Sequence, residues 1–132
     1  MIDQINEYFT DIYFHLHPEQ QEPISHQSVR ILQMVGKRES VMIRDIASLL
    51  SISHNTASEH VKKLTAGGWL YKERDEKDQR KVYLHLTESG IAVLKKNTEL
   101  DGEKLEAALE KLSAEERQQI FTAFKLLSEA SK

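Results

Sequence analysis

Apolar residues recur at every third or fourth position along most of the chain, which predicts a largely helical protein. The first stripe runs through residues 2–16 and predicts an amphipathic helix; its members are Ile2, Ile5, Phe9, Ile12, Tyr13 and Leu16. Residues 17–23 contain both prolines and predict a short connection. A second helix is expected to start after Ser25 and to end at Gly36 in a left-handed cap.

The next segment predicts two short helices joined by a tight turn. Residues 43–50 have the apolar spacing of the first helix, and residues 51–53 form the turn. Ser53 has a hydroxyl that suits the N-cap of the second helix, and Gly67 and Gly68 suit its end. The inward positions of this second helix are Ala57, Val61 and Leu64.

Two extended segments follow, at residues 69–74 and 81–87. Apolar and polar side chains alternate from Lys81 to Leu86, which is typical of a half-buried strand. The charged stretch 75–80 between the segments predicts the tip of a β-hairpin.

Helical periodicity returns after Thr87 and continues to the last residues of the sequence. A seam close to a heptad repeat predicts one long helix; its apolar positions are Ile91, Leu94, Leu105, Leu109 and Leu112. Ser113 and Glu116 have the spacing of a capping box, which predicts the start of a last helix.

This order of elements predicts a mostly α fold with a small β-hairpin wing, arranged as a winged helix-turn-helix. The 132 residues fit a single domain, 1–132. We expect the helix-turn-helix and its wing to occupy residues 25–90, with helical regions at 1–17 and 91–132.

The net charge of −3 argues at first against a nucleic-acid partner, but its distribution changes the picture. The stretch from His54 to Lys81 contains seven Lys/Arg and five acidic residues, a local net charge of +2 against −5 for the remainder. A basic middle in an acidic protein favours a DNA-binding segment joined to parts with another task.

Several protein classes are disfavoured by the composition. The lack of cysteine excludes disulfides, thiolate metal sites and a cysteine nucleophile. The sequence lacks a glycine-rich phosphate loop and a nucleophile motif, so we predict neither an enzyme nor a cofactor. An apolar run of membrane-spanning length and a signal-peptide layout are also missing, which predicts a cytoplasmic protein without a membrane partner.

The outer face of the second short helix carries donors and acceptors that suit the major groove of duplex DNA. The candidate DNA-binding residues on and beside this helix are Ser53, His54, Asn55, Thr56, Ser58, Glu59, Lys62 and Lys63. The Asn55 amide suits recognition of adenine, whereas the hydroxyls and the two lysines suit phosphate contacts. A solvated surface helix is the alternative interpretation of the same pattern.

The charged tip of the hairpin supplies the second half of the candidate interface. We expect Arg80 to enter a minor groove and Asp78, two residues earlier, to hold its guanidinium extended. Arg74 is a further candidate for DNA contact. The alternative is an ordinary surface ion pair between Asp78 and Arg80, which contributes little to stability.

The run from Ile46 to Gly90 resembles the MarR (multiple antibiotic resistance regulator) family of transcription factors. The resemblance lies in the segments Ile46-Ala47-Ser48-Leu49-Leu50-Ser51-Ile52-Ser53, Thr56-Ala57-Ser58, Gly68-Trp69-Leu70, Asp78-Gln79-Arg80 and Leu84-His85-Leu86-Thr87-Glu88-Ser89-Gly90. Val61, Leu64 and the last-helix opening Leu112-Ser113-Ala114-Glu115-Glu116-Arg117 extend it. Two positions depart from the family pattern: Ser51 replaces a usual glycine, and Glu59 replaces a frequent basic residue. We expect Ser51 to fit if its φ is negative, and Glu59 to accept from a cytosine amino group or to repel phosphate.

The resemblance implies a sequence-specific transcriptional regulator, a repressor in our interpretation. It further implies N- and C-terminal dimerisation helices, a homodimer, a palindromic double-stranded DNA operator and a small-molecule effector that changes the spacing of the recognition helices. Tyr8, Tyr13 and Phe14 fit either an effector pocket or, more simply, a dimer core.

The sequence allows two other hypotheses, a metal site and a protein-binding module. His15, His17 and His26 invite a metal site, but His15 and His17 face different ways on a helix and acids at ligand spacing are missing nearby. A winged-helix module that binds protein rather than DNA is the main alternative, and the Asp78–Arg80 wing favours DNA over it.

Overall fold

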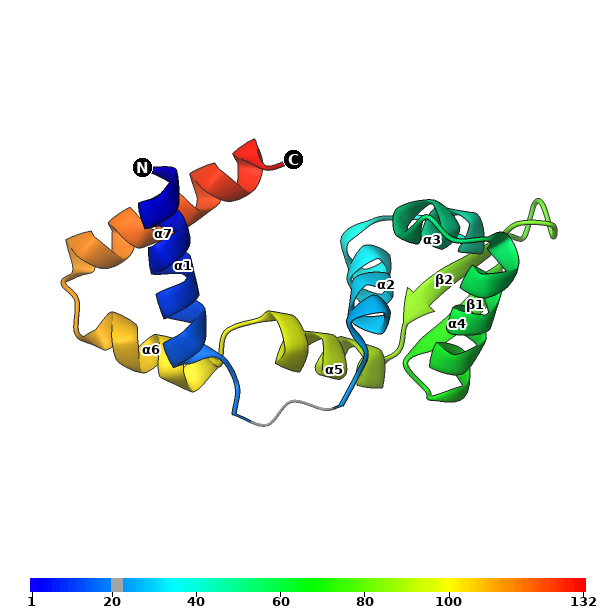
Figure 1. Ribbon diagram of the computed structural model, residues 1–132, viewed down its shortest axis with the longest axis horizontal. Helices are drawn as coiled ribbons and strands as arrows, with labels where there is room; N and C mark the ends of the chain where they lie inside the picture. The colour runs from blue at the N-terminus through cyan, green and yellow to red at the C-terminus, as the bar shows by residue number, and fades with distance from the viewer. Residues whose placement is uncertain (20–22) are drawn as a thin grey trace. The chain divides into compact units, whose positions relative to one another are not determined.

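The computed structural model describes residues 1–19 and 23–132, which form two compact units. The terminal unit consists of Met1–His17 and Leu100–Lys132, and the winged unit of Pro18–Glu99. The elements, shown in Figure 1, are α1 (Ile2–Leu16), α2 (His26–Lys37), α3 (Ile43–Leu50), α4 (His54–Ala66), β1 (Leu70–Arg74), β2 (Val82–Leu86), α5 (Glu88–Thr98), α6 (Gly102–Glu110) and α7 (Ala114–Ala130). The predicted mostly helical fold with a hairpin wing is confirmed.

The hydrophobic core of the winged unit forms where α2, α3 and α4 pack against the hairpin and α5. Its fully buried side chains include Ile31 and Leu32 of α2 and Ile46 of α3. The three inward residues predicted for α4 are buried, namely Ala57, Val61 and Leu64. Because only this stripe of α4 is apolar, its burial leaves the polar face of the helix in solvent.

The turn between α3 and α4 differs from the expectation in one dihedral angle. Ser51 has φ 53° and ψ 47°, in the left-handed region, so the expected negative φ is wrong. The left-handed residue lets the Ile52 amide donate to the Ala47 carbonyl at 3.0 Å, which closes α3 before the chain turns. Ser53 then caps α4 as predicted, accepting from the Thr56 amide at 3.1 Å.

Helix α2 starts after Ser25, as predicted, but ends later than expected. Ser25 accepts from the Ser28 amide, and the helix runs through Gly36 to Lys37 before the chain extends at Arg38. The left-handed cap at Gly36 is therefore wrong. Glycine serves packing there, because a Cβ would lie 3.1 Å from the Leu86 side chain.

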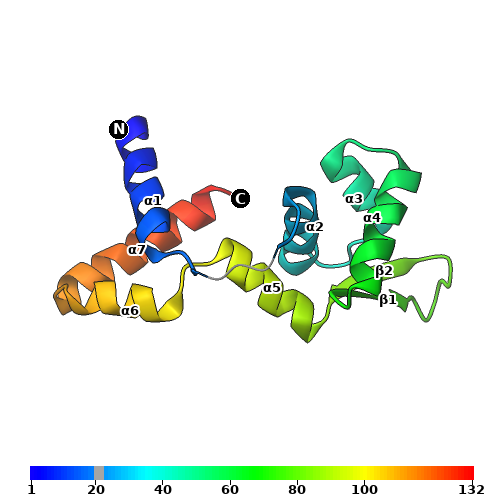
Figure 2. The ribbon, with the colours of Figure 1, turned by 60° about the horizontal axis from the view of Figure 1, so that its bottom comes forward.

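The wing is a two-stranded antiparallel hairpin whose register runs from Leu70 opposite Leu86 to Arg74 opposite Val82. The strands are slightly shorter than the predicted segments 69–74 and 81–87. Leu84 is buried, and its amide donates to the Val41 carbonyl at 2.8 Å, which ties the wing to the α2–α3 connection. The hairpin tip projects beyond the helices of its unit in both views (Figures 1 and 2).

The long helix predicted after Thr87 is wrong, because the chain breaks between α5 and α6. Glu99 is extended, and the Asp101 side chain accepts from the Lys104 amide at 3.0 Å to begin α6. The Asp101 amide donates to the Leu16 carbonyl at 2.8 Å, a contact with α1 that a continuous helix would prevent. Helix α5 belongs to the winged unit, which ends at Glu99. The predicted C-terminal helical region, 91–132, therefore begins too early.

The terminal unit consists of α1, α6 and α7, and within the described residues none of these helices contains a buried side chain. The predicted capping box opens α7: the Glu116 amide donates to Ser113 Oγ at 3.1 Å, and the Ser113 amide donates to Glu116 Oε1 at 2.9 Å. The predicted connection 17–23 includes residues 20–22, which lie outside the described residues. None of the described helices is long and apolar enough to cross a membrane.

The start of α5 locks the base of the wing. Thr87 Oγ1 accepts from the Gly90 amide at 2.9 Å and donates to the Gly68 carbonyl at 2.6 Å. The Thr87 amide donates to the Trp69 carbonyl at 3.1 Å. Gly90 lies so close to the residue before β1 that a Cβ on it would lie 2.1 Å from the Trp69 carbonyl oxygen.

We therefore expect Gly90→Ala to lower the free energy of unfolding by about 2 kcal/mol, because backbone must shift to admit the methyl group. Gly102→Ala is the matched control, since a Cβ there meets nothing within 4 Å. Denaturant unfolding of both variants measures the difference. Equal stability of the two would show that the α5–β1 contact is not tight.

Ser51 provides a second stability test. Ser51→Gly should raise the free energy of unfolding by up to about 1 kcal/mol, because glycine adopts the left-handed conformation without strain. Ser51→Val should lower it by about 1 kcal/mol, since a β-branched side chain is poorly tolerated there. Thermal or denaturant unfolding reports both values, and a valine variant as stable as the glycine variant would contradict the assigned conformation.

Candidate nucleic-acid interface

The outer face of α4 presents most of the side chains predicted to contact DNA. Six of them are exposed, namely His54, Asn55, Thr56, Glu59, Lys62 and Lys63, while Ser58 is half-buried. Because α4 begins at His54, the first of these residues lie in its first turn, where helix-turn-helix proteins contact base edges. The structure thus places these predicted residues on α4 and at its N-cap, Ser53.

Two of the predicted hydroxyls also have a structural task. Ser53 Oγ accepts from the Thr56 amide and donates to Thr56 Oγ1 at 2.9 Å, so both residues belong to the N-cap of α4. The Thr56 hydroxyl accepts in this bond and keeps its own proton for another acceptor. A phosphate oxygen is such an acceptor.

The wing tip is built around the Asp75 carboxylate. Asp75 Oδ1 accepts from the amides of Lys77 at 2.7 Å and Asp78 at 3.2 Å, and Oδ2 accepts from the Tyr83 hydroxyl at 3.3 Å. The bond from the Lys77 amide is the largest cause that lowers the pKa of Asp75 below its ordinary value of 3.8, followed by that from Asp78. These hydrogen bonds give the tip a defined shape.

Asp78 and Arg80 form the ion pair predicted from their spacing. Arg80 Nε donates to Asp78 Oδ1 at 3.1 Å, and the Arg80 amide donates to the same oxygen at 3.1 Å. The hydrogen bond from the Arg80 side chain is the largest cause of a lowered Asp78 pKa. The Arg80 side chain is 91% exposed, so the pair holds the guanidinium in solvent rather than against the protein.

Arg74, a further candidate for DNA contact, is the last residue of β1. Its guanidinium Nη1 donates to the Gln79 carbonyl at 2.5 Å, across the base of the wing tip. This contact gives Arg74 a role within the hairpin, and its predicted contact with DNA stays a prediction.

Charge is divided unevenly between the two units. The winged unit contains 13 Lys/Arg and 11 Asp/Glu, and the terminal unit contains 5 Lys/Arg and 10 Asp/Glu.

Two cations that were not among the predicted DNA-binding residues, Arg44 of α3 and Lys81 before β2, line the same cleft as Arg80. The sequence did offer a signal for Arg44: it lies in the first turn of the predicted helix 43–50, where the helix dipole disfavours a cation.

His15, His17 and His26 lie at the end of α1 and the start of α2. Among the described residues there is no group of three His, Cys, Asp or Glu side chains that could hold a metal ion. His17 Nδ1 instead donates to the Tyr13 carbonyl at 2.9 Å, at the end of α1.

Sequence comparisons place the chain among regulators. Residues 17–97 match the family described as Transcriptional regulator SarA/Rot. The HTH-type transcriptional regulator BilQ of Clostridium symbiosum is 29% identical over 113 residues, which cover 86% of this chain and 78% of that protein. The organic hydroperoxide resistance transcriptional regulator of Bacillus subtilis is 26% identical over 106 residues, covering 80% and 71%.

Solved structures share the fold. Transcriptional regulator Tm0710 from Thermotoga maritima has a TM-score of 0.62 and 26% identity, covering 81% of this chain and 75% of that one. S. aureus MepR bound to ethidium bromide has a TM-score of 0.62 and 20% identity, covering 99% and 94%. A MepR mutant bound to an oligodeoxyribonucleotide has a TM-score of 0.55 and 22% identity, covering 83% and 80%.

The Asp78–Arg80 pair predicts an acid transition of the wing. Because the folded-state pKa of Asp78 is lowered, the pair stabilises the wing at and above pH 3.8 and this contribution disappears as the pH falls through the lowered pKa. We expect the NMR signals of the Arg80 amide and Nε–H to shift with a midpoint below 3.8.

Asp78→Asn is the control for that titration, because it should abolish the transition at Arg80 while the Lys77 amide still reports Asp75. A midpoint for Arg80 at or above 3.8 in the wild-type protein would contradict the geometry of the pair.

Proposed function

Because the chain belongs to the SarA/Rot family of transcriptional regulators, we propose that it is a repressor that binds a palindromic DNA operator as a homodimer. Its resemblance to MarR regulators is confirmed by the winged-helix fold that it shares with Tm0710 and MepR. Its role as a DNA-binding transcriptional regulator follows from the family. The operator geometry, the pairing and the direction of regulation are our proposals.

One observation carries the proposed mode of binding: an exposed polar helix face and an exposed arginine lie on the same unit. Helix α4 buries its apolar stripe and turns Asn55 toward solvent, while Asp78 holds Arg80 at the wing. In the proposed complex α4 enters a major groove and Arg80 an adjacent minor groove. Lys62 and Lys63 neutralise phosphates, which makes binding salt-dependent.

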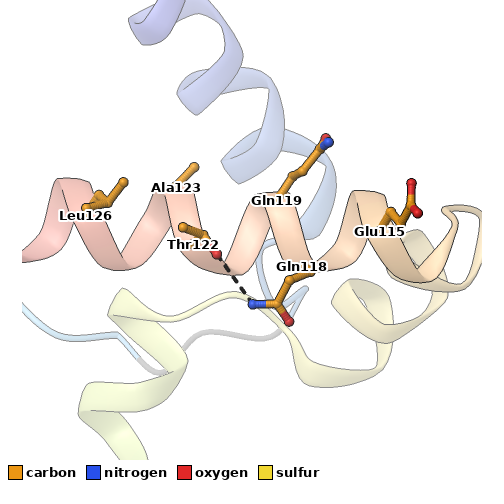
Figure 3. Close-up of a pocket in the computed structure, with 6 residues that line it drawn as sticks. All are labelled: Glu115, Gln118, Gln119, Thr122, Ala123 and Leu126. Atoms are coloured by element: carbon orange, nitrogen blue, oxygen red, sulfur yellow. Dashed lines mark hydrogen bonds between the residues drawn. The ribbon is translucent and has the colours of Figure 1, made fainter.

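The terminal unit supports pairing of two chains. It exposes large apolar side chains on α1 and α7, which are Ile2, Ile5, Tyr8, Phe9, Tyr13, Phe14, Phe121, Phe124, Leu126 and Leu127. A shallow groove of about 530 Å³ runs along α7 and is lined by six α7 residues (Figure 3). Two of them, Gln118 and Thr122, are joined by a hydrogen bond of 3.4 Å. Apolar area of this kind is characteristic of an interface, and a two-fold pair would present two α4 helices to a palindrome.

Repression follows from occupancy of the operator. Two recognition helices contact successive major grooves about 10 base pairs apart, and a protein on that site excludes polymerase. Structures of MepR with ethidium bromide and of PcaV with its natural ligand suggest relief by a small molecule. We extend that to this chain without assigning the molecule; the exposed Tyr8, Tyr13 and Phe14 fit the dimer core better.

The proposal is tested by fluorescence anisotropy of purified protein with duplexes from its own upstream DNA. We expect saturable binding with two chains per site, which weakens as salt rises. Asn55→Ala should weaken binding about tenfold to the preferred duplex and relax the sequence preference. Arg80→Ala should weaken binding by a similar factor.

Lys96→Ala, an exposed cation on α5, is the matched control and should bind as the wild type does. Absence of sequence preference in the wild-type protein at low salt would sink the regulator model and leave a protein-interaction module as the better explanation.

A further inference from the structure

A cleft of about 510 Å³ lies between the start of α3, the start of α4 and the wing. Its lining residues are Met42, Ile43, Arg44, His54, Asp78, Arg80, Lys81 and Val82. The cleft is therefore lined both by His54, the first residue of α4, and by Arg80 of the wing.

The walls of this cleft are fixed by backbone hydrogen bonds within the winged unit. The Leu84 amide binds the Val41 carbonyl at 2.8 Å, which holds β2 beside the segment that leads into α3. The Lys81 amide donates to the Asp78 carbonyl at 2.9 Å, and the Asp75 amide donates to the Lys81 carbonyl at 2.9 Å. The cleft is consequently formed before any ligand arrives.

The cleft is electropositive. Arg44, Arg80 and Lys81 contribute three cations against the single carboxylate of Asp78, which is bonded to Arg80. The nearby Asp45 carboxylate is bonded to the Met42 amide at 2.8 Å as the cap of α3. Two helices, α3 and α4, also begin at this cleft, and their N-termini add partial positive charge.

Helix stability does not explain Arg44. A cation in the first turn opposes the helix dipole, and Arg44 is exposed, without an ion pair among the contacts of the described residues. A local conflict of this kind is expected at functional positions.

We infer that this cleft binds phosphate groups of the DNA backbone through Arg44 of α3 and Lys81 of the wing, which both line it. The inference rests on the proposed function and extends its interface to α3. A duplex separates its major groove from its minor groove by a phosphate backbone. The cleft lies between the element assigned to the major groove and the side chain assigned to the minor groove, so the strand that divides the grooves passes through it.

The test compares Arg44→Gln and Lys81→Gln with the matched control Lys37→Gln, which removes an exposed cation from the end of α2 outside the cleft. Each cleft variant should weaken binding to the preferred duplex and to a scrambled duplex by the same factor, about threefold to tenfold. Each should also reduce the slope of log affinity against log salt by about 1. Lys37→Gln should change neither quantity, and unchanged thermal unfolding shows that all three variants fold.

Several outcomes overturn the inference. If the wild type binds with sequence preference and the cleft variants match Lys37→Gln, the cleft inference fails while the proposed function stands. If the wild type lacks any preference, the proposed function fails and the inference fails with it. NMR titration with inorganic phosphate at fixed ionic strength gives a third arm: saturation of Arg44 and Lys81 signals below 1 millimolar, with duplex affinity insensitive to both variants, would assign the cleft to a free phosphate ligand instead of DNA.

Discussion

The hydrogen bond from the Leu84 amide to the Val41 carbonyl attaches the middle of the wing to the helices, and the Leu84 side chain is buried in their shared core. A two-stranded hairpin has little stability by itself in water, so its position depends on such attachment. The same contact sets β2 beside the start of α3, and the Thr87–Trp69 and Gly90–Trp69 contacts fix the opposite end of the hairpin. The distance between α4 and the wing is therefore a property of the folded core and does not depend on DNA.

Under the proposed function, helix α4 serves both stability and DNA recognition, with different residues for each. Its apolar stripe is buried against α3 and the wing. On the outer face, Thr56 takes part in the N-cap, and Asn55, Glu59, Lys62 and Lys63 are exposed. Polar substitutions on the outer face should therefore alter recognition with little effect on folding, because they remove no buried contact. The wing behaves similarly: Asp75 shapes the tip internally, and Arg80 faces outward on the Asp78 carboxylate.

Features that depend on residues close together in the sequence, such as helix caps and local ion pairs, were predicted well. The structure contains several features that were predicted from local spacing. They are the start of α2 after Ser25, the caps at Ser53 and Ser113, the inward face of α4 and the Asp78–Arg80 pair. Features set by distant contacts were missed. Gly36 was interpreted as a cap but packs against Leu86 and Leu94, and the predicted long helix breaks because Asp101 bonds to Leu16. The cleft beside Arg44 could not be predicted, since residues separated by more than 30 positions line it.

The exposed apolar faces of α1 and α7 have a consequence for how much protein must be present. The terminal helices contain no buried side chain within the part of the chain that the structure describes. In the proposed homodimer, most of their apolar surface is therefore buried only when the second chain covers it. Under the proposed pairing, dilution loosens the terminal helices before it affects the winged unit, whose core is complete in one chain. The apparent melting temperature should then rise with protein concentration, and operator occupancy should fall faster than in proportion when synthesis slows.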